Sequence, residues 1–340
     1  MCMSEDHLSN ETSVSAELTE TGIKASAKSR TVSSMDRLLG GTIDAGSAWL
    51  EGVAMRRRAK NEGERQLIEA TVKYGLDKMN IDDQFAQRTF EGHFAKIARH
   101  QLNKDAVVAE ALDDLKQMPP SDQEAAHGPS TVSEGFMGPF ERYAETASSE
   151  ELRQRWGRIL SAEIRRPGTF SSKVLRATDE LDSSTAKLFE NLMRYHSRGM
   201  LVNAIMPEIE YTDRLRLIEA GLLVDPGIGG QSLTFGEGDG WGVPFWGTQF
   251  GQITVCFAKS VALPVKGNDI LKIRDQRPAF GVHILTETGR ALSSILPSYE
   301  YKIGLEYARK LQTVVGANEV FLIVPAGDGK FGKSSVPPAP

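Results

Sequence analysis

The residue types that bind nucleotide phosphates occur in one run near the carboxyl end of the sequence. Residues 327–334 follow the pattern G-x-x-x-x-G-K-[ST], in which main-chain amides and a lysine hold the phosphates. This pattern needs a helix directly after the Lys-Ser pair, so that the first helical amides face the anion. Residues 335–340 contain three prolines, which are incompatible with such a helix. We therefore interpret the run as part of a polar tail.

Other patterns of catalytic or metal-binding residues are weaker still. The six histidines are scattered, and His93 and His100 lie seven residues apart with no carboxylate at metal-ligand spacing. Cys2 and Cys256 are too few for a disulfide scaffold, and Cys256 alternates with apolar residues as a buried strand residue does. No Gly-x-Ser-x-Gly nucleophile turn occurs. We predict no catalytic residue, no metal and no cofactor, and keep a hydrolase as the third hypothesis.

Basic residues are concentrated in residues 153–198. This stretch holds ten Lys and Arg residues against five Asp and Glu residues, whereas the whole chain has a net charge of −5. Because phosphate contacts supply much of the affinity for nucleic acids, this basic patch predicts a nucleic-acid partner. A solvated helix face is the alternative. The candidate nucleic-acid-binding residues are Arg153, Arg158, Arg165, Arg166, Lys173 and Arg176.

A second candidate interaction segment covers residues 38–60. Its first part, residues 38–55, is apolar and interrupted by glycines, and Arg56-Arg57-Arg58 follows directly. A basic flank of this kind favours contact with an anionic membrane surface. Packing against a second copy of the chain is the alternative that we favour. The residues that would make these contacts are Trp49, Arg56, Arg57 and Arg58.

Composition places the chain among soluble globular proteins. Hydrophobic residues make up 40% and charged residues 25% of its 340 residues, which allows one large or two modest domains. No run of 18 apolar residues is present, and the first residues lack the basic and apolar regions of a secretory signal. We therefore expect a cytoplasmic protein.

The hydrophobic periodicity predicts an α+β fold that is mainly helical. Two segments poor in apolar residues, 1–34 and 326–340, are predicted to be disordered tails. Between them we expect a helical arm, a linker that begins at Pro119-Pro120, a central helical module and a winged-helix-like α+β part. These four parts cover residues 35–118, 119–134, 135–200 and 201–325.

Local signals refine this outline. Ser148 with Glu151 three residues later has the spacing of a capping box, and Thr286 is suited to cap a later helix. Residues 225–251 contain nine glycines and several aromatic residues. We expect this glycine-rich segment to fold inward over the adjacent strands, and a partner-binding loop is the alternative. Strands are predicted at residues 253–257, 260–263 and 281–285.

A family resemblance starts from the helix that contains Trp156. The helix ends in Ser161-Ala162-Glu163-Ile164, Pro167-Gly168 stops it, and Phe170-Ser171 opens the next helix. In this order the segment resembles a bacterial family known as domain of unknown function 2806. The resemblance extends over about residues 84–324, with an insertion at 226–251 as its main departure. It implies no activity and no catalytic residues.

Our leading hypothesis is a non-enzymatic bacterial binding or regulatory protein that contacts nucleic acid through the basic patch. An oligomeric or membrane-surface effector acting through residues 38–60 is the alternative. No pattern in the sequence predicts a small-molecule ligand.

Overall fold

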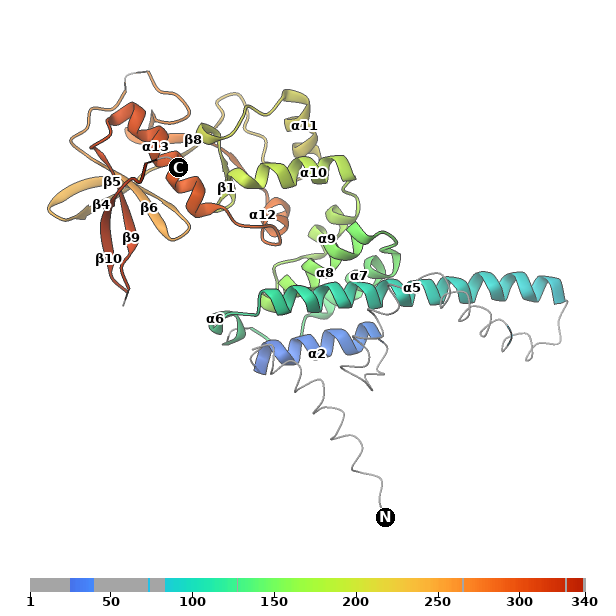
Figure 1. Cartoon of the computed structure of the whole chain (residues 1–340). Helices are drawn as coiled ribbons and strands as arrows, with labels where there is room; N and C mark the ends of the chain where they lie inside the picture. The colour runs from blue at the N-terminus through green and yellow to red at the C-terminus, as the bar shows by residue number, and fades with distance from the viewer. Residues whose placement is uncertain are drawn as a thin grey trace, which may run out of the picture. The chain divides into compact units, whose positions relative to one another are not determined.

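The computed structural model describes residues 25–39, 73, 83–126, 128–264, 266–327 and 329–338. Over these residues the fold is α+β and mainly helical, as predicted, with two antiparallel sheets in its carboxyl-terminal part (Figure 1). The chain divides into two compact units on either side of residue 175, inside helix α9 (Ser172–Asp179). This division differs from the expected boundary near residue 200.

The amino-terminal unit is built on a long helix, α5 (Asp83–Gln117). Helices α2 (Ala25–Leu39), α7 (Glu134–Thr146) and α8 (Glu150–Arg165) all pack against it. Helix α6 (Asp122–Ala126) follows α5 and contacts α2. Because α7 and α8 lie on α5, the expected helical arm and central module share one core.

Aromatic rings fill the space between α7 and α8. The Phe140 ring meets the Trp156 ring edge-on at 5.9 Å between centroids, and Tyr143 stacks on Trp156 at 5.0 Å. Trp156 is almost fully buried. Pairs in these orientations stabilise a core beyond the effect of their buried area. The tryptophan of the family-like segment therefore has a packing role.

Helix α2 corrects the prediction of a disordered tail over residues 1–34, since residues 25–34 are helical. One face of this helix is buried and carries small or polar side chains together with two larger apolar ones. These residues are Ala27, Arg30, Thr31, Ser34, Met35 and Leu38. Their spacing of three and four residues is that of a helical stripe. Composition alone missed the helix because this stripe contains few large apolar residues.

Three other local expectations are refined in this unit. The predicted linker at 119–134 contains the short helix α6. The cap of α8 is Ser149, whose side chain accepts a hydrogen bond from the amide of Leu152 at 3.2 Å, and not Ser148. The stop after α8 is confirmed, and Gly168 there has a φ of +90°, which glycine adopts without strain.

The carboxyl-terminal unit contains two five-stranded antiparallel sheets. The first has the order β1-β2-β8-β3, with β7 also paired to β8, and the second has the order β10-β9-β6-β5-β4. The first sheet comprises β1 (His196–Ser197), β2 (Met200–Val202), β3 (Gln231–Thr234), β7 (Lys272–Arg274) and β8 (Arg277–Ile284). The second comprises β4 (Gly236–Gly240), β5 (Val243–Phe250), β6 (Ile253–Ala258), β9 (Val320–Pro325) and β10 (Phe331–Ser335).

Helices precede, interrupt and follow these strands. They are α10 (Ser183–Leu192), α11 (Tyr211–Glu219), α12 (Glu287–Ser293) and α13 (Glu300–Val315), with 3₁₀ turns η1 (Met193–Tyr195) and η2 (Asn203–Ile205). Helix α13 supplies Tyr307 to the core, where its hydroxyl donates to the Ile270 carbonyl at 2.7 Å. Thr286 caps α12 by accepting from the Gly289 amide, as predicted.

The glycine-rich segment forms strands β3, β4 and β5, so most of it is not a loop, and contact with a partner stays a prediction. Phe235 and Phe245 are buried, and the Phe235 ring contacts the Phe257 ring at 5.2 Å. Trp241, at the turn between β4 and β5, is half exposed. The inward orientation of the two phenylalanines agrees with the expectation.

Two strand predictions differ from the structure. Residues 260–263 are irregular, because the chain turns directly after β6, where the Val261 amide donates to the Ala258 carbonyl at 3.2 Å. Strands β6 and β8, which we assigned to one winged-helix-like element, belong to different sheets. The expected disordered tail at 326–340 contains β10, which pairs with β9 and includes Lys333 and Ser334 of the phosphate-binding pattern. A strand therefore occupies the place where that pattern needs a helix.

The close approach of α5 and α8 generates a test of the fold. A Cβ at Gly157 would collide with the Glu110 side chain and lie 3.0 Å from the Ala111 nitrogen. We expect Gly157→Ala to lower the free energy of unfolding by about 1–3 kcal/mol, since the two helices would have to separate. Gly92 in α5 has open space around it, so Gly92→Ala should raise stability by about 0.5–1 kcal/mol. Urea unfolding followed by circular dichroism measures both, and equal effects would contradict the packing.

Candidate functional site

The six candidate nucleic-acid-binding residues do not share one environment. Arg153 points inward, where its Nε donates to the Ala147 carbonyl at 2.9 Å and its Nη2 donates to Asn103 Oδ1 at 2.7 Å. These bonds join the start of α8 to α5 and to the end of α7. Arg153 is therefore a structural residue, and the sequence could not show this because its partners are 6 and 50 residues away.

Arg165 is also engaged within the protein. Its Nη2 lies 2.5 Å from Asp114 Oδ2, and its Nε donates to the Met118 carbonyl at 2.9 Å. Ser161 donates from its hydroxyl to the same Asp114 oxygen at 2.5 Å. The Arg165 side chain is only 12% exposed and the Asp114 side chain only 15%. Arg165 thus joins the end of α8 to the end of α5 through these bonds, and its side chain is not available to a partner.

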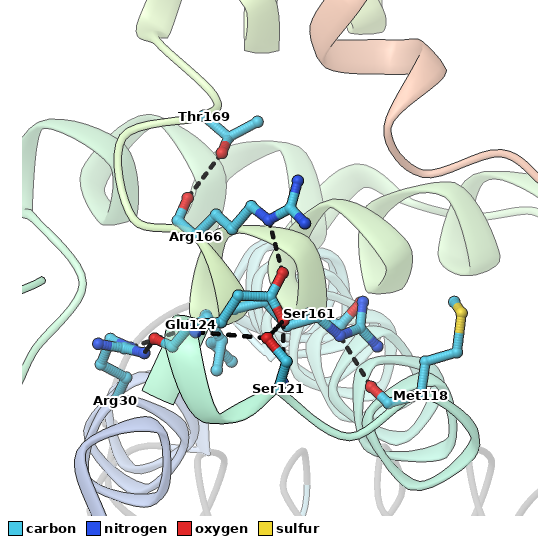
Figure 2. A network of polar contacts seen from close by, with 9 residues as sticks. Arg30, Met118, Ser121, Glu124, Ser161, Arg166 and Thr169 are labelled. Atoms are coloured by element: carbon cyan, nitrogen blue, oxygen red, sulfur yellow. Dashed lines mark hydrogen bonds and ion pairs between the residues drawn. The ribbon is translucent and has the colours of Figure 1, made fainter. Parts of the chain in front are cut away.

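Arg166, the next residue, is different. Figure 2 shows its guanidinium directed at the Glu124 carboxylate. The Arg166 Nε lies 2.5 Å from Glu124 Oε1, but the Arg166 side chain is 71% exposed. Glu124 also accepts from the amide and the hydroxyl of Ser121, both at 2.9 Å. Burial opposes the ionisation of Glu124, yet the bonds from Ser121 and Arg166 outweigh it and hold the pKa of this carboxyl below its usual value. Arg166 presents an exposed but already paired cation.

A residue that we did not predict contacts the main chain of Glu124, the partner of Arg166. Arg30 of α2 is fully buried and donates to the carbonyls of Ile164 at 2.7 Å, Pro129 at 3.0 Å and Glu124 at 3.0 Å. Figure 2 shows its guanidinium against the Glu124 main chain. Burial lowers the pKa of Arg30, although arginine keeps its charge at physiological pH. The helical stripe of α2 is the sequence signal that could have revealed it.

Glu163 holds the turn between α8 and α9. Its carboxylate is almost fully buried and accepts hydrogen bonds from the amides of Gly168 at 2.6 Å and Phe170 at 3.0 Å. Burial raises the pKa of Glu163, and the main-chain donors only partly offset this effect. The order of residues that carries the family resemblance therefore encodes a folded turn.

Three of the candidate cations are both exposed and without an ion pair among the described residues. They are Arg158 on α8 and Lys173 and Arg176 on α9. Within the described residues, none of these three side chains forms an ion pair or a hydrogen bond. Lys173 and Arg176 are three residues apart in one helix, a spacing that puts both side chains on the same face. These cations, together with Arg166, are what remains of the predicted basic patch as a contact surface.

The second candidate segment lies almost entirely outside the described residues. Of residues 38–60, only Leu38 and Leu39, at the end of α2, are described. Trp49, Arg56, Arg57 and Arg58 are not, so their role in membrane contact or self-association stays a prediction. Over the described part of the chain, no helix has the length and apolar character needed to cross a membrane.

The structure adds little that points to catalysis. Cys256 is buried as expected, and burial raises the pKa of its thiol to about 12, so the thiol stays protonated. In the ranges that the structure describes, no three His, Cys, Asp or Glu side chains are grouped to hold a metal ion.

Comparison with known proteins supports the resemblance over a segment. Residues 87–203 match the model of a family described as a protein of unknown function, DUF2806. The match includes α8, the Glu163 turn and α9, and it ends at Asn203, so the expected extension to residue 324 lies outside it. No curated protein and no solved structure matches the chain.

The contrast between Arg165 and Arg166 can be tested directly. Arg165→Gln leaves the buried Asp114 carboxylate without its ion pair, and we expect it to lower the free energy of unfolding by about 3 kcal/mol. The Arg166 side chain is itself 71% exposed, and Glu124 keeps its two hydrogen bonds from Ser121, so Arg166→Gln should lower the free energy of unfolding by less than about 1 kcal/mol. Urea unfolding of the two variants measures the difference. Similar stability losses in both would contradict the distinction.

The buried Glu163 predicts an unusual pH dependence. Because its pKa is raised in the folded state, the folded protein holds the extra proton between the ordinary and the raised pKa, and stability falls as pH rises through that window. Glu163→Gln cannot titrate. The unfolding free energy of the wild type minus that of the variant should thus be larger at about pH 4 than at about pH 7. A difference that grows with pH would show that the carboxylate is stabilised when ionised.

Proposed function

We propose that this chain is a non-enzymatic binding protein that contacts the phosphate backbone of nucleic acid through Arg158, Lys173 and Arg176, with Arg166 beside them in sequence. The observation that carries the proposal is the exposure of the first three cations without a described ionic partner. Because the whole chain has a net charge of −5, a local group of unpaired cations is where an anionic partner would be attracted. Phosphate is the anion that arginine and lysine contact most often in nucleic-acid complexes.

The scaffold beneath these cations supports the proposal. Helix α9 starts directly after the turn that Glu163 holds, and Ser172 donates from its hydroxyl to the Gly135 carbonyl at 3.1 Å. Main-chain anchoring of this kind fixes where Lys173 and Arg176 leave the helix. Less conformational freedom is then lost when a partner binds.

The chemistry of the surface defines the kind of binding. Lysine and arginine on a short helix contact phosphates without selecting bases, so we expect binding that depends weakly on sequence and strongly on salt. Removing one cation that touches a phosphate reduces the slope of log affinity against log salt by about 0.9 for duplex DNA.

The test is a fluorescence-anisotropy titration of the full chain with duplex DNA and single-stranded RNA at several salt concentrations. We expect Lys173→Gln with Arg176→Gln to weaken binding to duplex DNA and to reduce the salt slope by about 2. The matched control is Lys302→Gln with Lys310→Gln, which removes the same charge from exposed positions of α13. This control should bind as the wild type does.

Two results would contradict the proposal. One is the absence of binding to either nucleic acid at low salt. The other is an equal loss of affinity in the test and control variants, which would show that only the net charge matters. Glutamine substitution of Arg165 is unsuitable as a test, because that residue stabilises the fold.

A further inference from the structure

The carboxyl-terminal unit contains a cavity of about 710 Å³. This volume lies within the range of small-molecule binding sites in proteins. Its walls come from η2, α11, the loop before β3, and the β7 and β8 strands. The polar side chains that line it are Asn203, Glu208, Arg214, Gln231, Asp269, Lys272 and His283.

Two polar atoms of this wall are buried without a partner. They are Asn203 Oδ1 and His283 Nδ1, and neither forms a hydrogen bond within the described residues. Buried polar atoms in proteins are nearly always hydrogen-bonded, so each unpaired one requires an explanation. Both atoms belong to residues that line the same cavity. Both atoms are shielded from solvent, so a molecule inside the cavity would pair with them after small movements of the surrounding side chains.

A glycine brings the polar groups of the wall together. A Cβ at Gly281 would collide with Asp269 Oδ1 and lie 3.2 Å from Asn203 Nδ2. The Gly281 amide donates to the Asp269 carbonyl at 2.9 Å. The Asp269 and Asn203 side chains therefore both lie against Gly281, and a side chain at residue 281 would displace them.

The charges of the wall are of both signs. The Arg214 guanidinium lies over the Tyr211 ring at 5.7 Å, and no described carboxylate pairs with it. Glu208 is exposed and also has no described cation beside it. Lys272 and Asp269 face one another across 3.8 Å, so they largely balance each other. The cavity thus offers one cation and one carboxylate without a partner among the described residues.

The His283 imidazole is a neutral hydrogen-bonding group in this wall. Burial and the Arg214 charge lower its pKa, and Asp269 only partly opposes them. The imidazole is therefore uncharged at neutral pH, and its Nδ1 can accept or donate one hydrogen bond. The net charge that a ligand meets comes from Arg214 and Glu208.

We infer that this cavity binds a small zwitterion, a free amino acid or a dipeptide, whose carboxylate contacts Arg214 and whose ammonium group donates to Asn203 Oδ1 and Glu208. A guanidinium and a carboxylate are geometrically matched, which favours a carboxylate end at Arg214. A dianion would be repelled by Glu208, whose charge no described cation balances, and an uncharged molecule would leave Arg214 unpaired. The site is independent of the cations proposed to bind nucleic acid.

The experiment screens the full chain by thermal shift with each of the twenty common L-amino acids and with the corresponding glycyl dipeptides. The strongest compound is then measured by isothermal titration calorimetry. Its N-acetyl and carboxamide analogues, which lack the ammonium or the carboxylate charge, serve as chemical controls. The amino-acid and dipeptide arms distinguish the two sources of the same chemistry.

We expect Arg214→Gln to weaken binding at least about tenfold, because a charge-assisted hydrogen bond is removed. Arg216→Gln on the same helix is the matched control, since Arg216 does not line the cavity and pairs with Asp213 at 3.7 Å. Asn203→Ala is the second variant, and it should weaken the parent compound more than its N-acetyl analogue.

Three outcomes would overturn the inference. In the first, no compound shifts the melting temperature or binds by calorimetry, in which case water alone fills the cavity. In the second, both analogues bind as well as the parent compound. In the third, Arg216→Gln weakens binding as much as Arg214→Gln does.

Discussion

Arg30 places a positive charge inside the amino-terminal unit, and three main-chain carbonyls satisfy it. These belong to Glu124 in α6, Pro129 in the following loop and Ile164 in the last turn of α8. A buried guanidinium is tolerated only when such acceptors are in place, so the positions of these segments depend on one another. Arg165 with Asp114, and Glu163 with the Gly168 and Phe170 amides, extend the same polar connections around the end of α8.

These connections decide which basic residues are available to a partner. Sequence counting treats the ten cations of residues 153–198 alike, but the fold uses Arg153 and Arg165 for internal bonds. The exposed cations Arg158, Lys173 and Arg176 lie on the helices that this network fixes. The structure thus separates the basic residues that bond within the fold from those whose side chains are exposed to solvent. Only the exposed residues support a proposal about function.

Patterns of local periodicity predicted much of the fold. The helix with Trp156, the Thr286 cap and the strand predicted at 253–257 follow from signals within a few residues. Helix α2 escaped prediction because its buried stripe is made mostly of small or polar residues, and Arg30 is satisfied by groups 94 to 134 residues away. The cavity of the carboxyl-terminal unit also escaped, since its lining comes from segments spread over residues 203–283.

The central claim is that the polar network at the end of α8 holds the turn to α9 rigidly. Native-state hydrogen exchange of the Gly168 and Phe170 amides, followed by NMR, tests it most directly. Both amides donate to the buried Glu163 carboxylate, so we expect them to exchange only through global unfolding of the unit, as core helix amides do. Exchange at the rate of an unprotected loop would contradict the account.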